Sequence, residues 1–190
     1  MTGQIPDEAN YLGTWYAITA VEGTGLFDPT EYGFDPRPMS TGCWRGYVCR
    51  YLVADDRLTL RGLEIGRTDE HERISLHGVT PTDGLFGALR YEPDAPVEFT
   101  GRLLIGDDYL RLGYLHMGFV PAWLFADVRE LVFDRGRLTH AYDRSAELAA
   151  VRERLGPAGL KPPSPDPEAR RAWIDATFSL SYAYSWPTVD

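Results

Sequence analysis

The feature that most constrains this chain is a strand–turn–strand pattern that recurs three times. Residues 52–60 (LVADDRLTL) are echoed at 104–112 (LIGDDYLRL) and, more loosely, at 131–139 (LVFDRGRLT). In each copy an apolar segment runs into a turn that contains Asp, and an alternating segment leaves it. Asp and Gly suit such turns because they tolerate positive φ or cap the turn with a side chain. We therefore predict three β-hairpins, with turns at Asp55-Asp56, Asp107-Asp108 and Arg135-Gly136.

The segments around these hairpins also favour strands. Residues 11–21 are rich in β-branched and aromatic side chains and predict a first strand. A loop rich in Pro and Gly follows at 22–41, which is either a functional lid or an ordered surface crossover. A weaker strand pair is expected around 72–79 and 84–91.

The chain changes character after Asp143. Residues 146–155 carry one apolar helical stripe that ends at Gly156, and they predict a helix. A Pro-rich segment at 157–167 predicts an extended connector. Asp166 as N-cap and Pro167 at the first helical position open a second short helix. Residues 179–186 alternate small and large side chains, which predicts a final strand that returns to the sheet.

These elements predict a mainly β fold. We expect an antiparallel meander barrel or strongly curled sheet of about nine to ten strands, with two short helices near the C-terminus. A two-sheet sandwich is the alternative. The 190 residues fit one domain, with the barrel at 1–143, the helical segment at 144–178 and the returning strand within 179–190.

Composition narrows the class of partner. The chain carries a formal charge of −9, so no basic surplus exists to neutralise phosphates, and neither nucleic acid nor an anionic membrane is expected as main partner. The start, MTGQIPDEAN, lacks a secretory signal pattern, which predicts a cytoplasmic protein. Cys43 and Cys49 fit no common zinc signature and, on one strand, would lie too far apart for a disulfide, so we expect buried reduced thiols.

One short motif resembles a known family. Gly13-Thr14-Trp15, in the first predicted strand, is similar to the Gly-x-Trp signature of lipocalins and the wider calycin group. The resemblance implies a barrel that holds small hydrophobic ligands, with the Trp closing one end and an Arg from a late strand lying across it. The predicted final strand offers no such Arg.

Strand parity places polar residues on the expected interior face. Leu110, Leu112, Tyr114 and His116 alternate along one strand, so His116 follows the apolar side chains inward.

The second strand of the first predicted hairpin, which begins after Asp55-Asp56, provides partners for His116. There Leu60 and Glu64 share a face, which places Glu64 at the position that corresponds to His116. Tyr47 then pairs opposite Glu64, Arg45 lies two residues along on the same face, and His140 joins from the third hairpin.

This convergence predicts a site with three interpretations. The cluster is a satisfied buried network, a ligand cavity, or an acid–base pair of Glu64 and His116. The candidate ligand-binding residues are Arg45, Tyr47, Glu64, Tyr114, His116 and His140. A bulge at Gly62 would instead turn Glu64 outward, because Leu63 and Ile65 are also apolar.

No strong catalytic motif is present, and no cofactor is expected. The run Asp69-Glu70-His71-Glu72 reads as a solvated turn, and we assign no metal site. The leading hypothesis is a cytoplasmic barrel that binds a small, largely apolar molecule, with a cyclase or isomerase activity as an extension. The alternative is a protein-interaction module, such as an immunity protein that neutralises a toxin. Its acidic charge, 11 tyrosines and 5 tryptophans would suit a basic protein partner.

Overall fold

The computed structural model describes residues 2–112, 117–162 and 164–188. The strands are β1 (Glu8–Tyr11), β2 (Thr14–Thr24), β3 (Tyr47–Ala54), β4 (Arg57–Ile65), β5 (Thr82–Asp83), β6 (Leu89–Tyr91), β7 (Ala95–Pro96), β8 (Thr100–Tyr109), β9 (Phe125–Asp134) and β10 (Arg137–Asp143). The helices are α1 (Ser145–Leu155), α2 (Pro167–Phe178) and α3 (Tyr182–Ser185). Short 3-10 helices are η1 (Pro29–Tyr32), η2 (His71–Arg73), η3 (Leu85–Gly87), η4 (Ala122–Leu124) and η5 (Gly156–Leu160).

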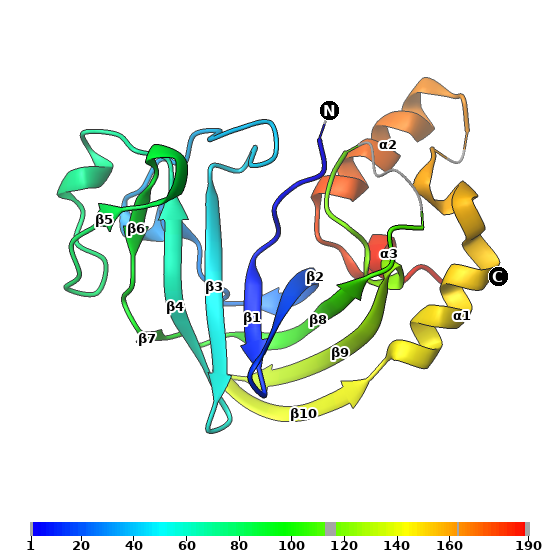
Figure 1. Cartoon of the computed structure of the whole chain (residues 1–190), viewed down its shortest axis with the longest axis horizontal. Coiled ribbons are helices and arrows are strands. Elements are labelled where there is room, and N and C mark those ends of the chain that lie inside the picture. The colour runs from blue at the N-terminus through cyan, green and yellow to red at the C-terminus, as the bar shows by residue number, and fades with distance from the viewer. Residues whose placement is uncertain (1, 113–116, 163, 189–190) are drawn as a thin grey trace.

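The strands form one sheet that closes on itself. Paired neighbours follow the order β10-β9-β8-β2-β1-β3-β4-β6-β5, and β7 also pairs with β4. Arg137 of β10 pairs with Arg57 of β4, which joins seven strands into a ring. The pairing of β1 with β3 is parallel, and the other strand pairs are antiparallel. The predicted mainly β fold of about ten strands, with helices near the C-terminus, is confirmed (Figure 1).

Two apolar cores hold the sheet together. Inside the ring, twenty buried residues of the described chain form one cluster, in which Tyr51, Tyr91 and Phe99 are among the largest fully buried side chains. On the outer face of β8 and β9, a second cluster packs Trp123 against Leu148 and other side chains of the C-terminal region. The helices therefore gather on one side of the barrel (Figure 1). Burial of apolar surface on both faces of these strands fixes their position.

Two of the three predicted hairpin turns are confirmed. Asp55 and Asp56 adopt φ of 49° and 56° between β3 and β4, and Arg135-Gly136 joins β9 to β10. The predicted turn at Asp107-Asp108 is wrong, because β8 runs through it and remains paired with β9 as far as Tyr109. A φ of 58° at Asp108 bends the strand without reversing it.

The N-terminal and middle segments differ in detail from expectation. The predicted strand 11–21 is a hairpin of β1 and β2, with Leu12 and Gly13 at its turn. β2 extends through residues 22–24 of the predicted loop, and the part of the loop that remains contains η1, whose N-cap Asp28 accepts a hydrogen bond from the Thr30 backbone N–H. Of the predicted strand pair at 72–79 and 84–91, only β6 in the second segment is a strand, and it pairs with β5, which lies outside both segments. In the first segment, residues 71–73 form η2 instead of a strand.

The two predicted helices are confirmed as α1 and α2. Asp166 caps α2 by accepting a hydrogen bond from the Ala169 N–H at 2.9 Å, as its position before Pro167 predicted. The predicted final strand is wrong. Ser181 accepts a hydrogen bond from the Tyr184 N–H and begins α3 instead, while the first part of the predicted extended connector forms η5.

No helix of the described residues is long and apolar enough to cross a membrane.

Three β-bulges decide which side chains face the interior. The paired register shifts by one residue at Thr19 in β2, at Arg61 in β4 and at Thr139 in β10. An extra residue in one strand reverses the facing of every side chain beyond it. The parity that the sequence predicts therefore fails in β4 and β10, where candidate site residues lie.

Candidate functional site

Glu64 does not face the barrel interior. Because the bulge at Arg61 reverses the parity of β4, Leu63 and Ile65 point inward, and Glu64 pairs with Val48 instead of Tyr47. Its carboxylate accepts hydrogen bonds from Arg90 Nε at 3.2 Å and Nη2 at 2.6 Å. The prediction that Glu64 and Tyr47 lie on one face is therefore wrong. The alternative, in which a bulge at Gly62 turns Glu64 outward, anticipated the cause to within one residue.

Arg45 and Tyr47 do lie together, with Asp7 as a partner that the sequence did not indicate. Arg45 donates from Nη1 to Asp7 Oδ2 at 2.8 Å and from Nε to the Tyr47 carbonyl at 2.8 Å. Its guanidinium lies 4.8 Å from the centre of the Tyr47 ring. Asp7 also accepts from the backbone N–H of Cys49, so one buried carboxylate ties the N-terminal segment to β3.

The electrostatics of this cluster are those of a satisfied network. Burial lowers and the facing Asp7 raises the pKa of Arg45, with a net rise. Burial raises the pKa of Tyr47 to about 12 and that of the buried Cys49 thiol well above its ordinary value. Cys43 and Cys49 are both free and buried, as predicted. The Arg45–Asp7 pair therefore fits the interpretation of a buried structural network.

The remaining candidates do not join this cluster. The bulge at Thr139 turns His140 and Tyr142 outward, where their rings stack with centroids 5.8 Å apart, so the prediction of an inward His140 is wrong. Tyr114 and His116 lie outside the described residues. The acid–base pair of Glu64 and His116 requires an inward Glu64, which the structure does not show, and the position of His116 stays a prediction.

The structure instead places a groove on the outer face of β3, β4 and β6. It has a volume of about 800 Å³. Trp15, with 46% of its surface exposed, and Leu85, with 53%, contribute apolar walls together with Ile5, Met39 and Val48. Such a volume lies within the range of ligand sites in proteins.

Charged side chains of both signs surround these apolar walls. The five guanidinium groups belong to Arg37, Arg50, Arg61, Arg67 and Arg90, and the four carboxylates to Glu8, Glu64, Glu92 and Asp94. The sheet register brings opposite charges face to face, since Glu8 pairs with Arg50 and Glu64 with Arg90. Such cross-strand pairs of opposite charge stabilise a sheet.

Gly62 forms a floor of the groove. It pairs with Arg50 in the register, and it has no side chain to fill the space above the sheet. A Cβ placed there would meet Arg50 Cβ at 3.7 Å and the Tyr91 carbonyl at 3.8 Å, which are ordinary contacts. The backbone therefore does not require glycine at this position, and the missing side chain opens the hollow.

Trp15 does not occupy the place that the calycin resemblance implies. Its side chain lies on the outside of the sheet and lines the groove, next to the β1–β2 hairpin. Sequence reasoning missed the groove because its residues come from separate segments spread between Ile5 and Asp94. The one available signal was Trp15 near the start of the first predicted strand, and its position there does not show which face of the sheet its side chain lies on.

The polar run at 69–72 has a structural role. His71 is buried, its Nδ1 donates to the Gly66 carbonyl at 2.7 Å, and its Nε2 accepts from the Asp35 N–H at 3.1 Å. Phe34 packs edge-on against the same ring at 5.4 Å. The imidazole thus fastens the loop at 22–41 to the end of β4. No group of three potential metal ligands occurs among the residues described.

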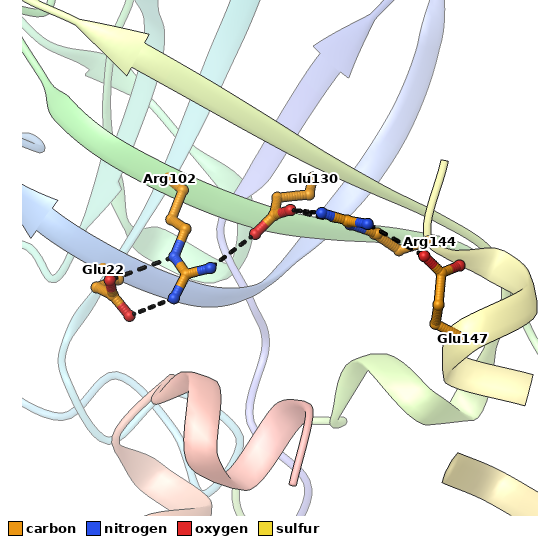
Figure 2. Close-up of polar contacts among 5 residues, drawn as sticks. All are labelled: Glu22, Arg102, Glu130, Arg144 and Glu147. Atoms are coloured by element: carbon orange, nitrogen blue, oxygen red, sulfur yellow. Dashed lines mark hydrogen bonds and ion pairs between the residues drawn. The ribbon is translucent and has the colours of Figure 1, made fainter. Parts of the chain in front are cut away.

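A second ionic arrangement lies on the outer face of β8 and β9 and shares no residue with the groove (Figure 2). Glu130, 3% exposed, accepts hydrogen bonds from Arg102 Nη1 at 3.1 Å and from Arg144 Nη2 at 2.7 Å. Arg102 also donates to Glu22, and Arg144 to Glu147, so five charged groups of alternating sign form one row with Glu130 at its centre. 

Aromatic rings of the C-terminal segment cover the two arginines of this row of charged groups. Tyr182 stacks 4.3 Å from the Arg102 guanidinium, and Trp186 lies 5.3 Å from that of Arg144. Burial, and next the charge of Glu130, raises the pKa of Tyr182. This row of charged groups therefore fastens α3 to the barrel, and, as in the Arg45–Asp7 pair, each charged side chain contacts one of opposite charge within the protein.

Comparisons with protein-family models, with curated proteins and with solved structures found no match.

Proposed function

We propose that this protein is an interaction module that binds a partner protein through the groove on the outer face of β3, β4 and β6. The observation that carries the proposal is the combination of an exposed tryptophan, further apolar side chains and arginines around one hollow of about 800 Å³. Trp and Arg are the residues that most often dominate the energy of protein interfaces. A module of this kind would function in the cytoplasm, for example as an immunity protein.

The packing of the barrel supports this proposal over an interior ligand site. Twenty buried, mostly apolar residues of the described chain pack into one cluster inside the ring. The polar cluster that would have oriented an interior ligand is divided, since Glu64 lies outside and Arg45 is bound by Asp7. An interior cyclase or isomerase site would need both free space and free polar groups.

A small molecule in the same groove is the second candidate. The groove volume of about 800 Å³ favours it, because drug-sized ligands occupy sites of roughly 300–1,000 Å³. The mixed charges on the lining favour a protein, since most of them already pair with one another and would form the rim of a larger interface.

Site-specific photocrosslinking in cells of the native source tests the proposal. Trp15 is replaced by a benzophenone amino acid, and the matched control carries the same group at Trp44, which is 55% exposed and does not line the groove. We expect a discrete protein adduct from position 15 only. Equal adducts from both positions, or a small molecule retained in native mass spectrometry with no protein adduct, would contradict it.

A further inference from the structure

We infer that two copies of this chain associate through the open edge of β10, as antiparallel strands related by a two-fold axis at Ala141. No residue of β10 lines the groove, so the inference goes beyond the proposed function and does not depend on it. It rests on the backbone of β10, on the side chains that this strand exposes and on their charge.

β10 is paired along only one of its two edges. Its register with β9 continues to Asp143, whereas on the other side its one paired residue is Arg137, opposite Arg57 of β4. The Leu138 N–H donates to the Asp56 carbonyl, and beyond that bond no backbone partner on this side is found among the described residues. β10 therefore forms the lower rim of the sheet in Figure 1, with one edge open.

The register shows which backbone groups point to the open edge. Opposite residues of antiparallel strands alternate between pairs that exchange both hydrogen bonds and pairs that exchange none. The Arg144 N–H donates to the Val128 carbonyl at 2.9 Å, so every second residue before Arg144 is bonded to β9. The residues between them, Ala141 and Asp143, consequently direct their N–H and C=O groups away from β9.

The side chains of β10 do not protect this edge. Proteins commonly guard an edge strand with Lys, other charges or Pro, because unpaired N–H and C=O groups attract a further strand. Residues 139–142 are all exposed, and they include no proline and no formal charge at pH 7. Arg137 and Asp143 compensate each other, so β10 is neutral within a chain that carries −9. Two acidic molecules repel each other least where such neutral surfaces meet.

A second copy brings side chains that match this edge. With the axis at Ala141, the two Ala141 residues exchange two N–H···O=C bonds, and His140 of each copy lies opposite Tyr142 of the other. Both rings face outward and stack with their planes 5° apart, and Tyr142 is 41% exposed.

The dimer therefore aligns four rings across the new strand pair, and cross-strand aromatic pairs stabilise a sheet. An extended segment of another protein would satisfy the same backbone groups, but the match of His140 with Tyr142 is built into a second copy.

Sedimentation velocity of the 190-residue chain over a range of concentrations tests the inference. One strand edge makes a small interface, so we expect a monomer–dimer equilibrium with a Kd between about 10 μM and 1 mM. Ala141→Lys places two ammonium groups opposite each other at the axis, which destabilises strand pairing. Ala150→Lys, at an exposed position of α1, makes the same change of charge and is the matched control.

We expect the Kd to rise about tenfold or more for Ala141→Lys and less than about twofold for Ala150→Lys. Circular dichroism and thermal melting verify that each variant folds. If Ala141→Lys does not fold, Ala141→Pro takes its place, because it removes the N–H donor at an edge position where Pro is tolerated.

A cysteine substitution tests the register. The Cα atoms of a hydrogen-bonded antiparallel pair lie about 5.5 Å apart, within reach of a disulfide, so Ala141→Cys should crosslink two copies in oxidised glutathione. Thr139→Cys is the control, because its two cysteines would lie four residues, about 14 Å, apart along the paired strands. Cys43 and Cys49 are buried and do not compete. Non-reducing electrophoresis measures both rates.

Three outcomes would overturn the inference. The first is a monomer at every concentration up to about 1 mM. The second is a dimer that Ala141→Lys leaves intact, and the third is crosslinking at equal rates from positions 139 and 141, since both results place the contact elsewhere. None of these outcomes bears on the groove, which crosslinking from position 15 tests separately.

Discussion

Replacement of Glu130 by Gln should lower the free energy of unfolding of the protein. The carboxylate is 3% exposed and receives hydrogen bonds from two arginines (Figure 2). A Gln of the same shape can accept from one of them, but its amide N–H groups then face the donors of the other. Loss of one partner from a buried ion pair costs about 3–5 kcal/mol.

The exposure of the two arginines reduces this figure. The Arg102 side chain is 42% exposed and that of Arg144 27%, so both can recover part of their hydration by turning toward water. We therefore expect a loss of about 2–4 kcal/mol in the free energy of unfolding. For a chain of 190 residues, about 3 kcal/mol corresponds to a fall of about 6–12 °C in Tm.

Urea and thermal unfolding, followed by far-UV circular dichroism, measure this loss. Glu147→Gln is the matched control, because its carboxylate meets the same Arg144 at 3.1 Å but is 45% exposed. That control should lose less than about 0.5 kcal/mol. If Glu130→Gln unfolds within about 0.5 kcal/mol of the wild type, the chain of charges is not what fastens the C-terminal segment, and the reasoning fails.

Three further predictions follow from the buried groups. Cys43 and Cys49 should react with a thiol reagent only after unfolding and without prior reduction, because burial raises the pKa of both thiols; labelling of the native protein would contradict this. Burial raises the pKa of Tyr47 and of Tyr184 to about 12, so stability should be fully present below pH 10 and fall as pH rises toward 12, measured by urea unfolding with tyrosinate absorbance at 295 nm. His71→Leu should cost about 1–3 kcal/mol and make the loop at 22–41 the first site of limited proteolysis, since two backbone groups lose their partner; an unchanged cleavage pattern would exclude this role.

Much of the fold could be predicted from the sequence where the signal is local. The Asp55-Asp56 and Arg135-Gly136 turns, and the helix opened by Asp166 and Pro167, depend on residues within three or four positions of one another. Turn and cap preferences are properties of the backbone and its nearest side chains, so they act before tertiary contacts form. The mainly β class followed from these turns and from the alternation between them.

The same local signals failed where a distant segment competed. Asp107-Asp108 has the composition of a turn, but pairing with β9 carries the strand through it. The alternation at 179–186 is typical of a strand, yet α3 is the better arrangement there. Its Ser185 hydroxyl accepts the buried Ala122 N–H at 2.7 Å, and its Tyr182 covers Arg102. Neither contact can be read from the segment itself.

The candidate site illustrates the division between sequence and tertiary structure most clearly. The sequence by itself determined that Tyr47 and Glu64 lie on paired strands, and it placed Trp15 near the start of the sheet, whereas Arg45, predicted on the same strand as Tyr47, lies in the turn before β3. Only the tertiary structure decided which way they face. Each bulge inserts one residue, and the closure of the ring determines where the sheet must bend to accommodate it. A shift of one residue exchanges the interior for the surface, because side chains along a strand alternate with a period of two.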